Sequence, residues 1–526
     1  MFTRARAWRI AAAALAVAAL SWCGLAQAGE EFVYKGAAYV SWSHDEYTYA
    51  AADDSLDDLA GTKANWATLL VTWYMDQLDS NTIAPWDEPP DNRKTPSDAS
   101  VVHAIQDLHA RGLKVCLKPH VDVKTYEWRG YINPADDNAW FTSYSAFTVH
   151  YAQMAQANDV EMYCIGTELK TMSGITYQTQ WNTVIDNIEA AYTGPLTYAP
   201  HTVEANDEHK TVCFWSRMDY GGASVYSPLT NLANPTVEQL VAAWSFNRSG
   251  VNVLQGLRNW QVSLGKPVIF LEIGYQSADT TNKTPWWVDS PVLDYQEQAD
   301  CYEAAFRVWM PESSWMKGLF FWGWSVSDPT PTHFTARDKP AMAVMRKWFQ
   351  PKPSVTAVSP SSGRMGGGTA VTVTGTNFET NGGTVSVKFG ADSATGVAIV
   401  DEAHLTCATP SGVAGPADVV VTNPNTLAGT LAGGYTYTGY ECDIGPRSAL
   451  GDEDLTAGDL VQARRFAAGL DSPAPGPEFQ RADCAPRESL GDGEFEAADL
   501  SQARRYVAGL DPLAGAGWPS TPAGAR

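Results

Sequence analysis

Two glutamates, Glu168 and Glu272, each end a short apolar run in the N-terminal part of the chain. A strand that is buried on both faces reads as an almost continuous run of Val, Ile, Leu and Phe. A carboxylate at the end of such a strand has to be satisfied in an open site at the rim of the sheet. Two facing carboxylates can cleave a glycosidic bond, one as acid and base and the other as nucleophile. The pair therefore indicates glycosidase chemistry, and its alternative role is to anchor loops by ion pairs.

Strand-like and helix-like stretches alternate over roughly residues 31–350. Amphipathic segments such as residues 97–111 and 295–309 separate the strands, so the repeating unit is a strand followed by a helix. Eight such units predict an α/β fold, a (β/α)8 TIM barrel over residues 29–350, with catalytic side chains at the carboxyl ends of the strands. The strand candidates are residues 35–40, 66–74, 114–119, 160–168, 196–198, 220–226, 267–272 and 318–324.

Four short motifs lie at the predicted strand ends. They are Lys118-Pro119-His120-Val121-Asp122, Ile165-Gly166-Thr167-Glu168-Leu169, Met218-Asp219-Tyr220-Gly221-Gly222 followed by Tyr226-Ser227-Pro228-Leu229, and Glu272-Ile273-Gly274-Tyr275-Gln276-Ser277. In this order they resemble glycoside hydrolase family 113, whose typical activity is that of an endo-β-1,4-mannanase. The resemblance implies a retaining hydrolase with Glu168 as acid/base after the fourth strand and Glu272 as nucleophile after the seventh. Most of the clan carries Asn where this chain has Thr167, a change that family 113 tolerates.

The polar side chains at the strand ends are expected to divide the chemistry between them. If Glu168 lies in a partly apolar pocket near a second carboxylate, it keeps its proton toward neutral pH, whereas Glu272 must stay ionised to attack. A carboxyl separation of about 5 to 5.5 Å would give retention of configuration. His120 and Asp122 flank one strand end and are expected to contact sugar hydroxyls, although a single His is more often structural.

Aromatic side chains supply the predicted walls of the site. The chain has 20 tryptophans, and an indole face stacks well on the C–H face of a sugar. We predict that Trp73, Trp128 and Trp322 bind substrate, and the resemblance implies that Trp322 is the platform under the reacting sugar. The resemblance also places the hydroxyl of Tyr226 against the nucleophile. Ordinary core packing is the alternative for each of these four residues.

Residues 1–28 read as a secretory signal peptide. Three arginines precede an apolar run at residues 10–20, and a small-residue cleavage site follows at residues 26–28. A membrane anchor is the weaker interpretation, because the run is short and rich in alanine. The expected localisation is secreted, in the extracellular space.

The formal net charge of −23 bears on the partners. A surface this acidic repels nucleic acid and anionic membranes but is compatible with a neutral polysaccharide. No Cys or His spacing typical of a zinc site is present, so no cofactor is expected for catalysis.

A second domain is predicted at residues 354–439, beyond the Pro-Lys-Pro sequence at 351–353. Short β-branched or aromatic runs separated by Gly and Pro predict a small all-β sandwich. The runs are residues 371–375, 385–390, 418–423 and 435–437. The segments 358–360, 366–369 and 375–378 (Val-Ser-Pro, Gly-Gly-Gly-Thr and Gly-Thr-Asn-Phe) resemble the immunoglobulin-like IPT/TIG family.

A third region, residues 441–513, repeats itself at an offset of 40, as in the helix motifs 462–466 and 502–506. This duplicated loop and helix resembles a dockerin, which implies structural calcium and a protein partner. The implied calcium ligands are Asp452, Asp454, Asp459, Asp492 and Asp499. The ligand set is incomplete, since Ser448, Leu450, Glu488 and Leu490 fill ligand positions. The alternative is a small helical cap stapled by Cys442 and Cys484, and residues 514–526 are an expected disordered tail.

The leading hypothesis is a secreted retaining endo-β-mannanase with two accessory modules. The nearest alternative is the same machinery acting on another β-glycan, such as a glucan or xylan, because the pocket contacts that select the sugar are not visible in the sequence. An alternative of a different class is a non-catalytic glycan-binding or cell-surface scaffold protein, which the sandwich and the repeat would suit.

Overall fold

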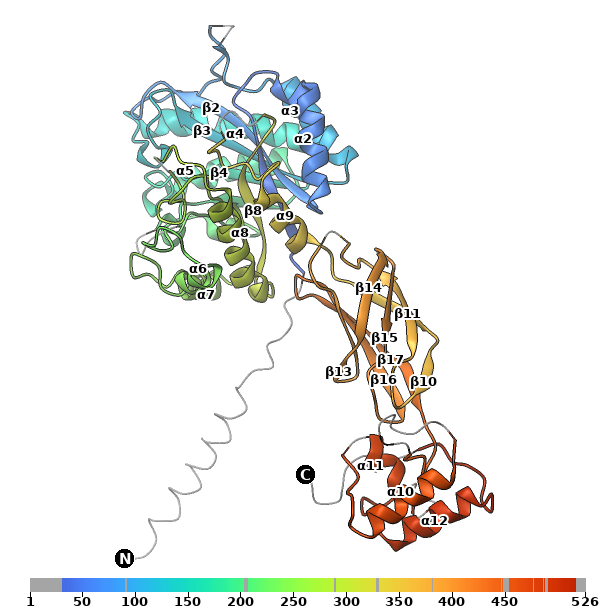
Figure 1. The fold of residues 1–526 in the computed structure, drawn as a ribbon. Helices are drawn as coiled ribbons and strands as arrows, with labels where there is room; N and C mark the ends of the chain where they lie inside the picture. Colours follow the sequence, from blue (N-terminus) through green and yellow to red (C-terminus); the bar gives the residue numbers. More distant parts are fainter. Residues whose placement is uncertain are drawn as a thin grey trace, which may run out of the picture. The chain divides into compact units, whose positions relative to one another are not determined.

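Eight apolar runs of the N-terminal unit form one parallel sheet (Figure 1). The strands are β1 (Tyr34–Val40), β2 (Trp66–Met75), β3 (Lys114–Val123), β4 (Met162–Thr167), β5 (Leu196–Ala199), β6 (Gly221–Val225), β7 (Val268–Ile273) and β8 (Met316–Ser325). Their order is β5-β4-β3-β2-β1-β8-β7-β6. Every residue of β1, β4, β5, β6 and β7 is buried, as expected for strands covered on both faces. The predicted TIM-like arrangement of eight strands is confirmed.

The computed structural model divides into two units, Met1–Phe349 and Gln350–Arg526. It describes residues 31–89, 92–202, 207–287, 290–327, 331–380, 382–445, 447, 454–475, 477–485, 487 and 491–516. The predicted signal peptide at 1–28 and most of the predicted tail at 514–526 lie outside the described residues. Among the helices that are described, none is both long enough and apolar enough to cross a membrane.

The sheet closes between its two edge strands, β5 and β6. A parallel bridge pairs His201 with Ser224 just beyond the end of β5. The N–H of Thr202 donates to the carbonyl of Ser224 at 3.0 Å, and the N–H of Ser224 donates to the carbonyl of Pro200 at 2.9 Å. Because closure occurs at the carboxyl ends of these strands, it places His201 on the rim where barrel enzymes carry their active sites.

Helices alternate with the strands and cover the outside of the barrel (Figure 1). They are α2 (Ala50–Gly61), α3 (Asp98–Ala110), α4 (Asp137–Ala157), α5 (Gln178–Ala191), α6 (Val237–Ala243), α7 (Val253–Leu264), α8 (Tyr295–Trp309) and α9 (Pro340–Phe349). Local signals set their ends. The hydroxyl of Ser97 accepts the N–H of Ser100 at the start of α3, and Gly265 ends α7 with a φ of 67°.

The second unit begins with a sandwich of two sheets, ordered β10-β17-β16-β12-β13 and β14-β15-β11-β9. The strands are β9 (Ser354–Ser359), β10 (Ser362–Arg364), β11 (Ala370–Thr376), β12 (Ser386–Phe389), β13 (Asp392–Ser393), β14 (Thr395–Asp401), β15 (His404–Ala408), β16 (Gly415–Thr422) and β17 (Ala428–Thr438). Val371 and Val373 of β11 are buried, whereas the residues on either side of them are not, which is the alternation of a sheet with one covered face. The predicted all-β sandwich is confirmed.

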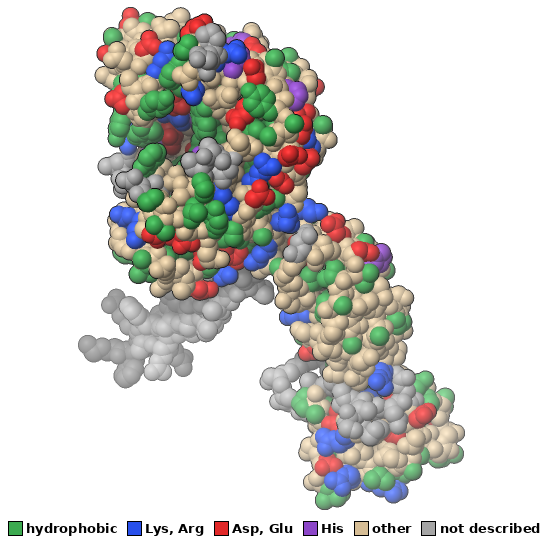
Figure 2. Space-filling view, turned by 45° about the horizontal axis from the view of Figure 1, so that its top comes forward, with side chains coloured by type: hydrophobic (Ala, Val, Ile, Leu, Met, Phe, Trp, Pro, Cys, Tyr) green, Lys and Arg blue, Asp and Glu red, His purple; other side chains and the backbone are tan. Residues whose placement is uncertain are grey.

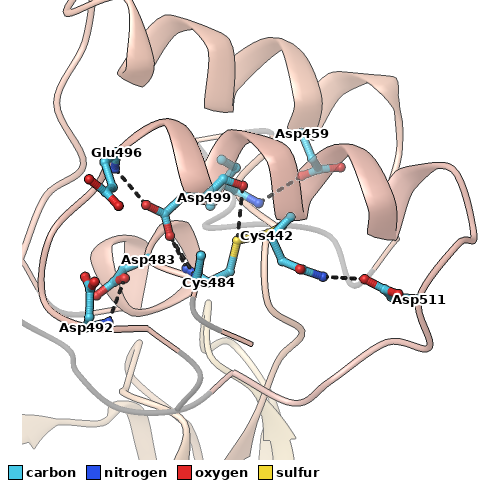
Figure 3. Close-up of a disulfide and its surroundings, with 11 residues drawn as sticks. Cys442, Asp459, Asp483, Cys484, Asp492, Glu496, Asp499 and Asp511 are labelled. Carbon is cyan, nitrogen blue, oxygen red and sulfur yellow. Dashed lines mark hydrogen bonds between the residues drawn. A yellow bond between two sulfur atoms is a disulfide. The ribbon is translucent and has the colours of Figure 1, made fainter. Parts of the chain in front are cut away.

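Two equivalent helices, α10 (Ala457–Ala467) and α12 (Ala497–Val507), follow the 40-residue repeat, and the short α11 (Pro477–Ala482) lies between them in sequence. A disulfide joins Cys442 and Cys484, which precede the two helices (Figure 3). Asp459 and Asp499 hold equivalent places in the first turns, where each carboxylate accepts backbone N–H groups. The donors are Ile444, Gly445 and Thr456 for the first, and Cys484, Ala485 and Glu496 for the second, all at 2.7 or 2.8 Å.

Replacing Asp499 by Asn should destabilise this repeat, because an amide oxygen can serve only part of the three backbone N–H groups that the carboxylate now accepts. We expect a loss of about 1 to 3 kcal/mol in the free energy of unfolding. Scanning calorimetry of the full chain, with and without calcium, would measure it. Asp492→Asn is the control, since Asp492 is exposed and accepts a single backbone N–H. An Asp499→Asn transition that matches the wild type would contradict the structural role.

Candidate active site

A cavity of about 810 Å³ opens at the carboxyl ends of the barrel strands. In Figure 2 the barrel unit is hollowed, and hydrophobic side chains gather along the rim of the hollow. Ten aromatic residues line the cavity, which are Trp42, Tyr74, Tyr126, Trp128, Tyr131, Tyr226, Trp286, Trp287, Trp322 and Phe334. Six charged or titratable residues share it, which are Asp122, Glu127, Arg129, Glu168, His201 and Glu272. Aromatic walls around a few convergent polar groups are typical of a sugar-binding site.

Glu272 lies near the end of β7 and is 4% exposed. One carboxylate oxygen accepts a hydrogen bond from the hydroxyl of Tyr226 at 2.8 Å. The other is bonded to the ammonium group of Lys118, a buried residue of β3. Burial and the charges of Glu272 and Glu168 raise the pKa of Tyr226 well above its usual range, so Tyr226 stays protonated and donates. Both carboxylate oxygens of Glu272 thus accept hydrogen bonds from side-chain donors, which fixes the orientation of the group as a nucleophile requires.

Glu168 follows the last residue of β4 and has a left-handed backbone, with a φ of 50°. Its N–H donates to the carbonyl of Ala199 at 2.9 Å, which ties this turn to the end of β5. The indole N–H of Trp128 donates to one carboxylate oxygen at 2.9 Å, and Nδ1 of His201 lies 3.6 Å from the other. A left-handed residue that is not glycine carries backbone strain, which is often found where a side chain must be aimed into a site.

The electrostatics of Glu168 correct one prediction. Burial raises the pKa of its carboxyl, but the neighbouring imidazole of His201, the charge of Arg129 and the indole of Trp128 outweigh burial and lower it. Glu168 in turn raises the pKa of His201 against the effect of burial. The prediction that Glu168 keeps its proton toward neutral pH is therefore wrong for the free site. Glu168 and His201 therefore shift each other's pKa in opposite directions, which favours the charged form of each group.

His120 and Trp322 lie beside Glu272. Trp322 lines the cavity, whereas His120 is 1% exposed and is not among the lining residues, so its contact with a sugar hydroxyl stays a prediction. Their rings stack with centroids 5.8 Å apart and planes 4° from parallel. Burial, Arg129 and Lys118 lower the pKa of His120 well below its usual range, so the imidazole is neutral. Neither ring nitrogen of His120 has a hydrogen-bond partner among the described residues. A buried neutral imidazole with open nitrogens can donate to one sugar hydroxyl and accept from another.

Asp122 lines the cavity but already has a partner, because its Oδ1 accepts a hydrogen bond from Nε of Arg129 at 2.9 Å. Arg129 begins the short helix η3 (Arg129–Tyr131), directly after Trp128. The ion pair therefore fixes the loop that brings the Trp128 indole to Glu168. Contact of Asp122 with a sugar hydroxyl stays a prediction.

The structure corrects the prediction for Trp73. Its indole N–H donates to the hydroxyl of Tyr151 at 2.8 Å, and its ring packs 5.2 Å from Phe147, both on α4. It is thus directed to the helix layer and is not among the residues that line the cavity. Successive side chains of a strand point to opposite faces, and the next residue of β2, Tyr74, lines the cavity instead.

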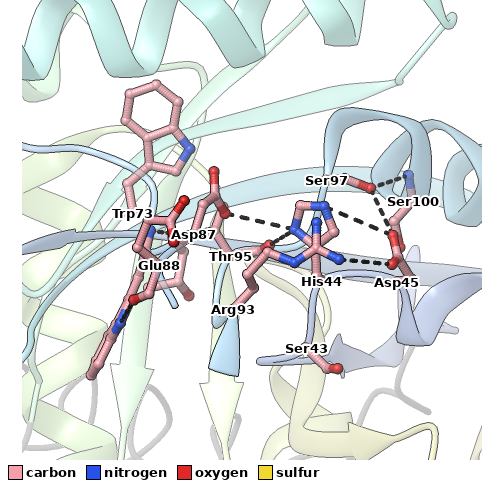
Figure 4. Close-up of polar contacts among 12 residues, drawn as sticks. Ser43, His44, Asp45, Trp73, Asp87, Glu88, Arg93, Thr95, Ser97 and Ser100 are labelled. Carbon is pink, nitrogen blue, oxygen red and sulfur yellow. Dashed lines mark hydrogen bonds and ion pairs between the residues drawn. The ribbon is translucent and has the colours of Figure 1, made fainter. Parts of the chain in front are cut away.

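The loops after β1 and β2 are joined by a polar network at the rim (Figure 4). His44 Nδ1 lies 3.0 Å from the carbonyl of Thr95 and 3.6 Å from a carboxylate oxygen of Asp87. Asp45 accepts a hydrogen bond from the hydroxyl of Ser97 at 3.3 Å. Trp42 lines the cavity and belongs to the same loop as His44. The network therefore fixes the loop that carries Trp42.

Sequence reasoning missed several residues of the site, above all His201 and Trp42, which line the cavity, and the buried Lys118, which binds Glu272. Lys118 stands two residues before His120 on β3, and this spacing places both on the same face of the strand. Trp42 follows the end of β1, a position that the strand-end argument could have included. His201 follows β5, which at four residues is the shortest strand of the barrel and gives the weakest pattern.

Among the described residues, one group of side chains could hold a metal ion, formed by Asp279, Asp294 and Glu297. Glu297 accepts the N–H groups of Thr280 and Asn282, both at 2.9 Å, so it anchors the loop after β7. The repeat contributes no such group within the described residues. Asp459 and Asp499 are turned to backbone amides, Asp492 accepts the N–H of Glu494 at 3.0 Å, Asp454 has other partners, and Asp452 lies outside the described residues. Calcium binding by the repeat therefore stays a prediction.

The fold and the site together define a barrel glycoside hydrolase. The family model for Glycoside Hydrolase Family 113 matches residues 38–345, which is more than half of the chain. The chain therefore belongs to glycoside hydrolase family 113. The IPT/TIG domain model matches residues 353–438, in agreement with the predicted second domain.

Solved structures are similar to the barrel unit. The GH113 β-mannanase AaManA from Alicyclobacillus acidocaldarius, in complex with ManMIm, is 28% identical, with a TM-score of 0.52, over 61% of this chain and 97% of that chain. A second GH113 β-1,4-mannanase, also solved as a complex, is 23% identical, with a TM-score of 0.52, over 61% of this chain and 99% of that chain. At that identity it supports the fold alone. A comparison with curated proteins finds no match.

Replacing His201 by Asn should raise the pKa of Glu168. The imidazole lowers this pKa and burial raises it, so burial has more effect once the imidazole is removed. Nuclear magnetic resonance titration of labelled glutamate carboxyls in the free protein would measure the change. His103→Asn is the matched control, since His103 lies on α3 and pairs with Asp107. A pKa of Glu168 that stays the same or falls in His201→Asn would show that His201 does not set its protonation.

Proposed function

We propose that the chain is a secreted retaining endo-β-mannanase, which cleaves β-1,4-linked mannan-type polysaccharide by double displacement. The observation that carries the proposal is that two carboxyl groups in one aromatic cavity have different hydrogen-bonding and charged neighbours. Glu272 accepts hydrogen bonds from Lys118 and Tyr226, whereas the Glu168 carboxylate lies 3.6 Å from the imidazole of His201. Membership in family 113 and the likeness to a β-mannanase of that family support the choice of substrate.

In the first step Glu272 attacks the anomeric carbon while the bond from that carbon to the glycosidic oxygen breaks. Glu168 gives its proton to the departing oxygen, and a covalent glycosyl-enzyme remains. A sugar chain that fills the cavity excludes water. The loss of water raises the pKa of the Glu168 carboxyl, so that this group carries the proton that it donates. In the second step Glu168 takes a proton from water, which attacks the same carbon and releases Glu272.

Buried polar groups next to the two glutamates support a mannan-type substrate. The side-chain oxygen of Thr167 is buried without a hydrogen-bond partner among the described residues, directly before Glu168. His120 offers two open ring nitrogens beside Glu272. Such groups discriminate between sugars that differ at one hydroxyl, because a wrong epimer leaves them unpaired. Hydrolysis of a panel of mannan, glucomannan, xylan and glucan would separate this substrate from the other β-glycans.

Secretion, a protein partner for the repeat and the role of the IPT/TIG domain complete the proposal as accessory features. The acidic sequence and the signal-like residues 1–28 support secretion. A non-catalytic scaffold is the weaker candidate, because both carboxyl groups and their donors are in place in the cavity. We place the whole activity on residues 29–350.

The two glutamates should respond differently to azide. Glu272→Ala removes the nucleophile, so activity on every substrate should fall by several orders of magnitude. Glu168→Ala should still form the glycosyl-enzyme from an activated aryl glycoside, whose leaving group departs without a proton, and then stall because no base activates water.

Azide needs no base, so it should restore turnover of Glu168→Ala with retained configuration, as product analysis would show. Rescue of Glu168→Ala with an inverted product, combined with rescue of Glu272→Ala with retained configuration, would reverse the two assigned roles.

A further inference from the structure

A third buried glutamate, Glu208, lies behind the catalytic pair and takes no part in the steps above. It begins the short helix η5 (Glu208–Lys210) and is 1% exposed. Removing a carboxyl group from water is costly unless several donors compensate it. Burial raises the pKa of Glu208 to about 7 against its hydrogen bonds, and the charge of Glu168 adds to the rise.

One arm of Glu208 reaches His201. Oε2 of Glu208 accepts the backbone N–H of His201 at 2.8 Å. Nδ1 of the same His201 lies 3.6 Å from the carboxylate of Glu168. Glu208 therefore fixes the backbone of His201, whose imidazole lies beside Glu168.

The second arm reaches the chain beside Glu168 itself. Oε1 of Glu208 accepts hydrogen bonds from the hydroxyl of Tyr198 and, at 2.9 Å, from the hydroxyl of Ser173. The Tyr198 oxygen in turn accepts the N–H of Leu169 at 2.8 Å. Since Leu169 is the residue after Glu168, this arm holds the strained left-handed turn that aims the carboxyl group into the cavity.

We propose that Glu208 is a positioning residue for acid/base catalysis, which clamps His201 and the Glu168 turn in one geometry. The inference rests on the proposed function for its catalytic readout. One arm ends on the backbone of His201 and the other on the residue after Glu168, whereas the other buried loop anchor described above, Glu297, binds only residues of a single loop. A displacement of about 1 Å at a catalytic group can cost on the order of 100-fold in rate.

The test compares leaving groups in the full-length protein. Glu208→Ala should lower kcat on mannan by about 10- to 100-fold, because departure of a sugar needs the proton of Glu168. The burst of dinitrophenol from a dinitrophenyl mannoside should change by less than about threefold, since that leaving group needs no proton. Glu208→Gln keeps an acceptor for the His201 N–H and should recover most of the activity on mannan.

Glu303→Ala is the matched control for loss of a buried carboxylate. Glu303 lies on α8, where it binds the side chains of Arg307, Lys347 and Trp348. It should lower stability and leave the ratio of the two activities unchanged. If Glu208→Ala does not fold, Tyr198→Phe, which removes the arm to Leu169, should show the same dependence on the leaving group.

A readout without substrate separates this inference from the proposed function. Hydrogen exchange of the His201 and Leu169 amides should accelerate in Glu208→Ala relative to Glu303→Ala. Equal losses on both substrates, an unchanged ratio, or unchanged exchange at the two amides would each overturn the positioning role. If the wild type hydrolyses no mannan while exchange at both amides accelerates, the proposed substrate fails and the clamp stands.

Discussion

Two carboxyl groups buried in one cavity repel each other, and the structure around them counters that repulsion with different donors for each. Lys118 and Tyr226 hold Glu272. Lys118 lies on β3 and Tyr226 directly follows β6, so both donors are placed by the barrel strands. Glu168 is held by Trp128 and His201, which lie on loops beyond the strand ends. Double displacement requires one carboxylate that attacks as an anion and one carboxyl group that first donates and then accepts a proton.

Closure of the barrel makes this division possible. The bridge between His201 and Ser224 joins the edge strands and brings β5 beside β6 at the rim. Without it His201 would not face Glu168, and burial alone would decide the protonation of that carboxyl. The same closure places the buried Glu208 where it binds the backbone of His201 and the hydroxyl of Tyr198.

Much of the fold could be predicted because buried parallel strands leave strong apolar runs. Glu168, Glu272, Tyr226, Trp128 and Trp322 all reach the cavity, since each was placed at a strand end or in the loop that follows. Trp73 did not, because a shift of one residue along a strand reverses the face and no neighbour in the sequence reveals it. The pKa shift of Glu168 could not be predicted either, because it depends on His201, a residue after the end of β5 that only the closed barrel brings near.

The central claim is that Glu272 is the nucleophile and carries the sugar between the two steps. A slow mannosyl substrate with fluorine at C2 and a fluoride leaving group destabilises the transition states of both steps, but the good leaving group lets the first proceed. Mass spectrometry of peptides from the inactivated enzyme would then locate the sugar. The account predicts a single label on the peptide that contains Glu272. A label on the peptide that contains Glu168, or inactivation without any covalent label, would contradict it.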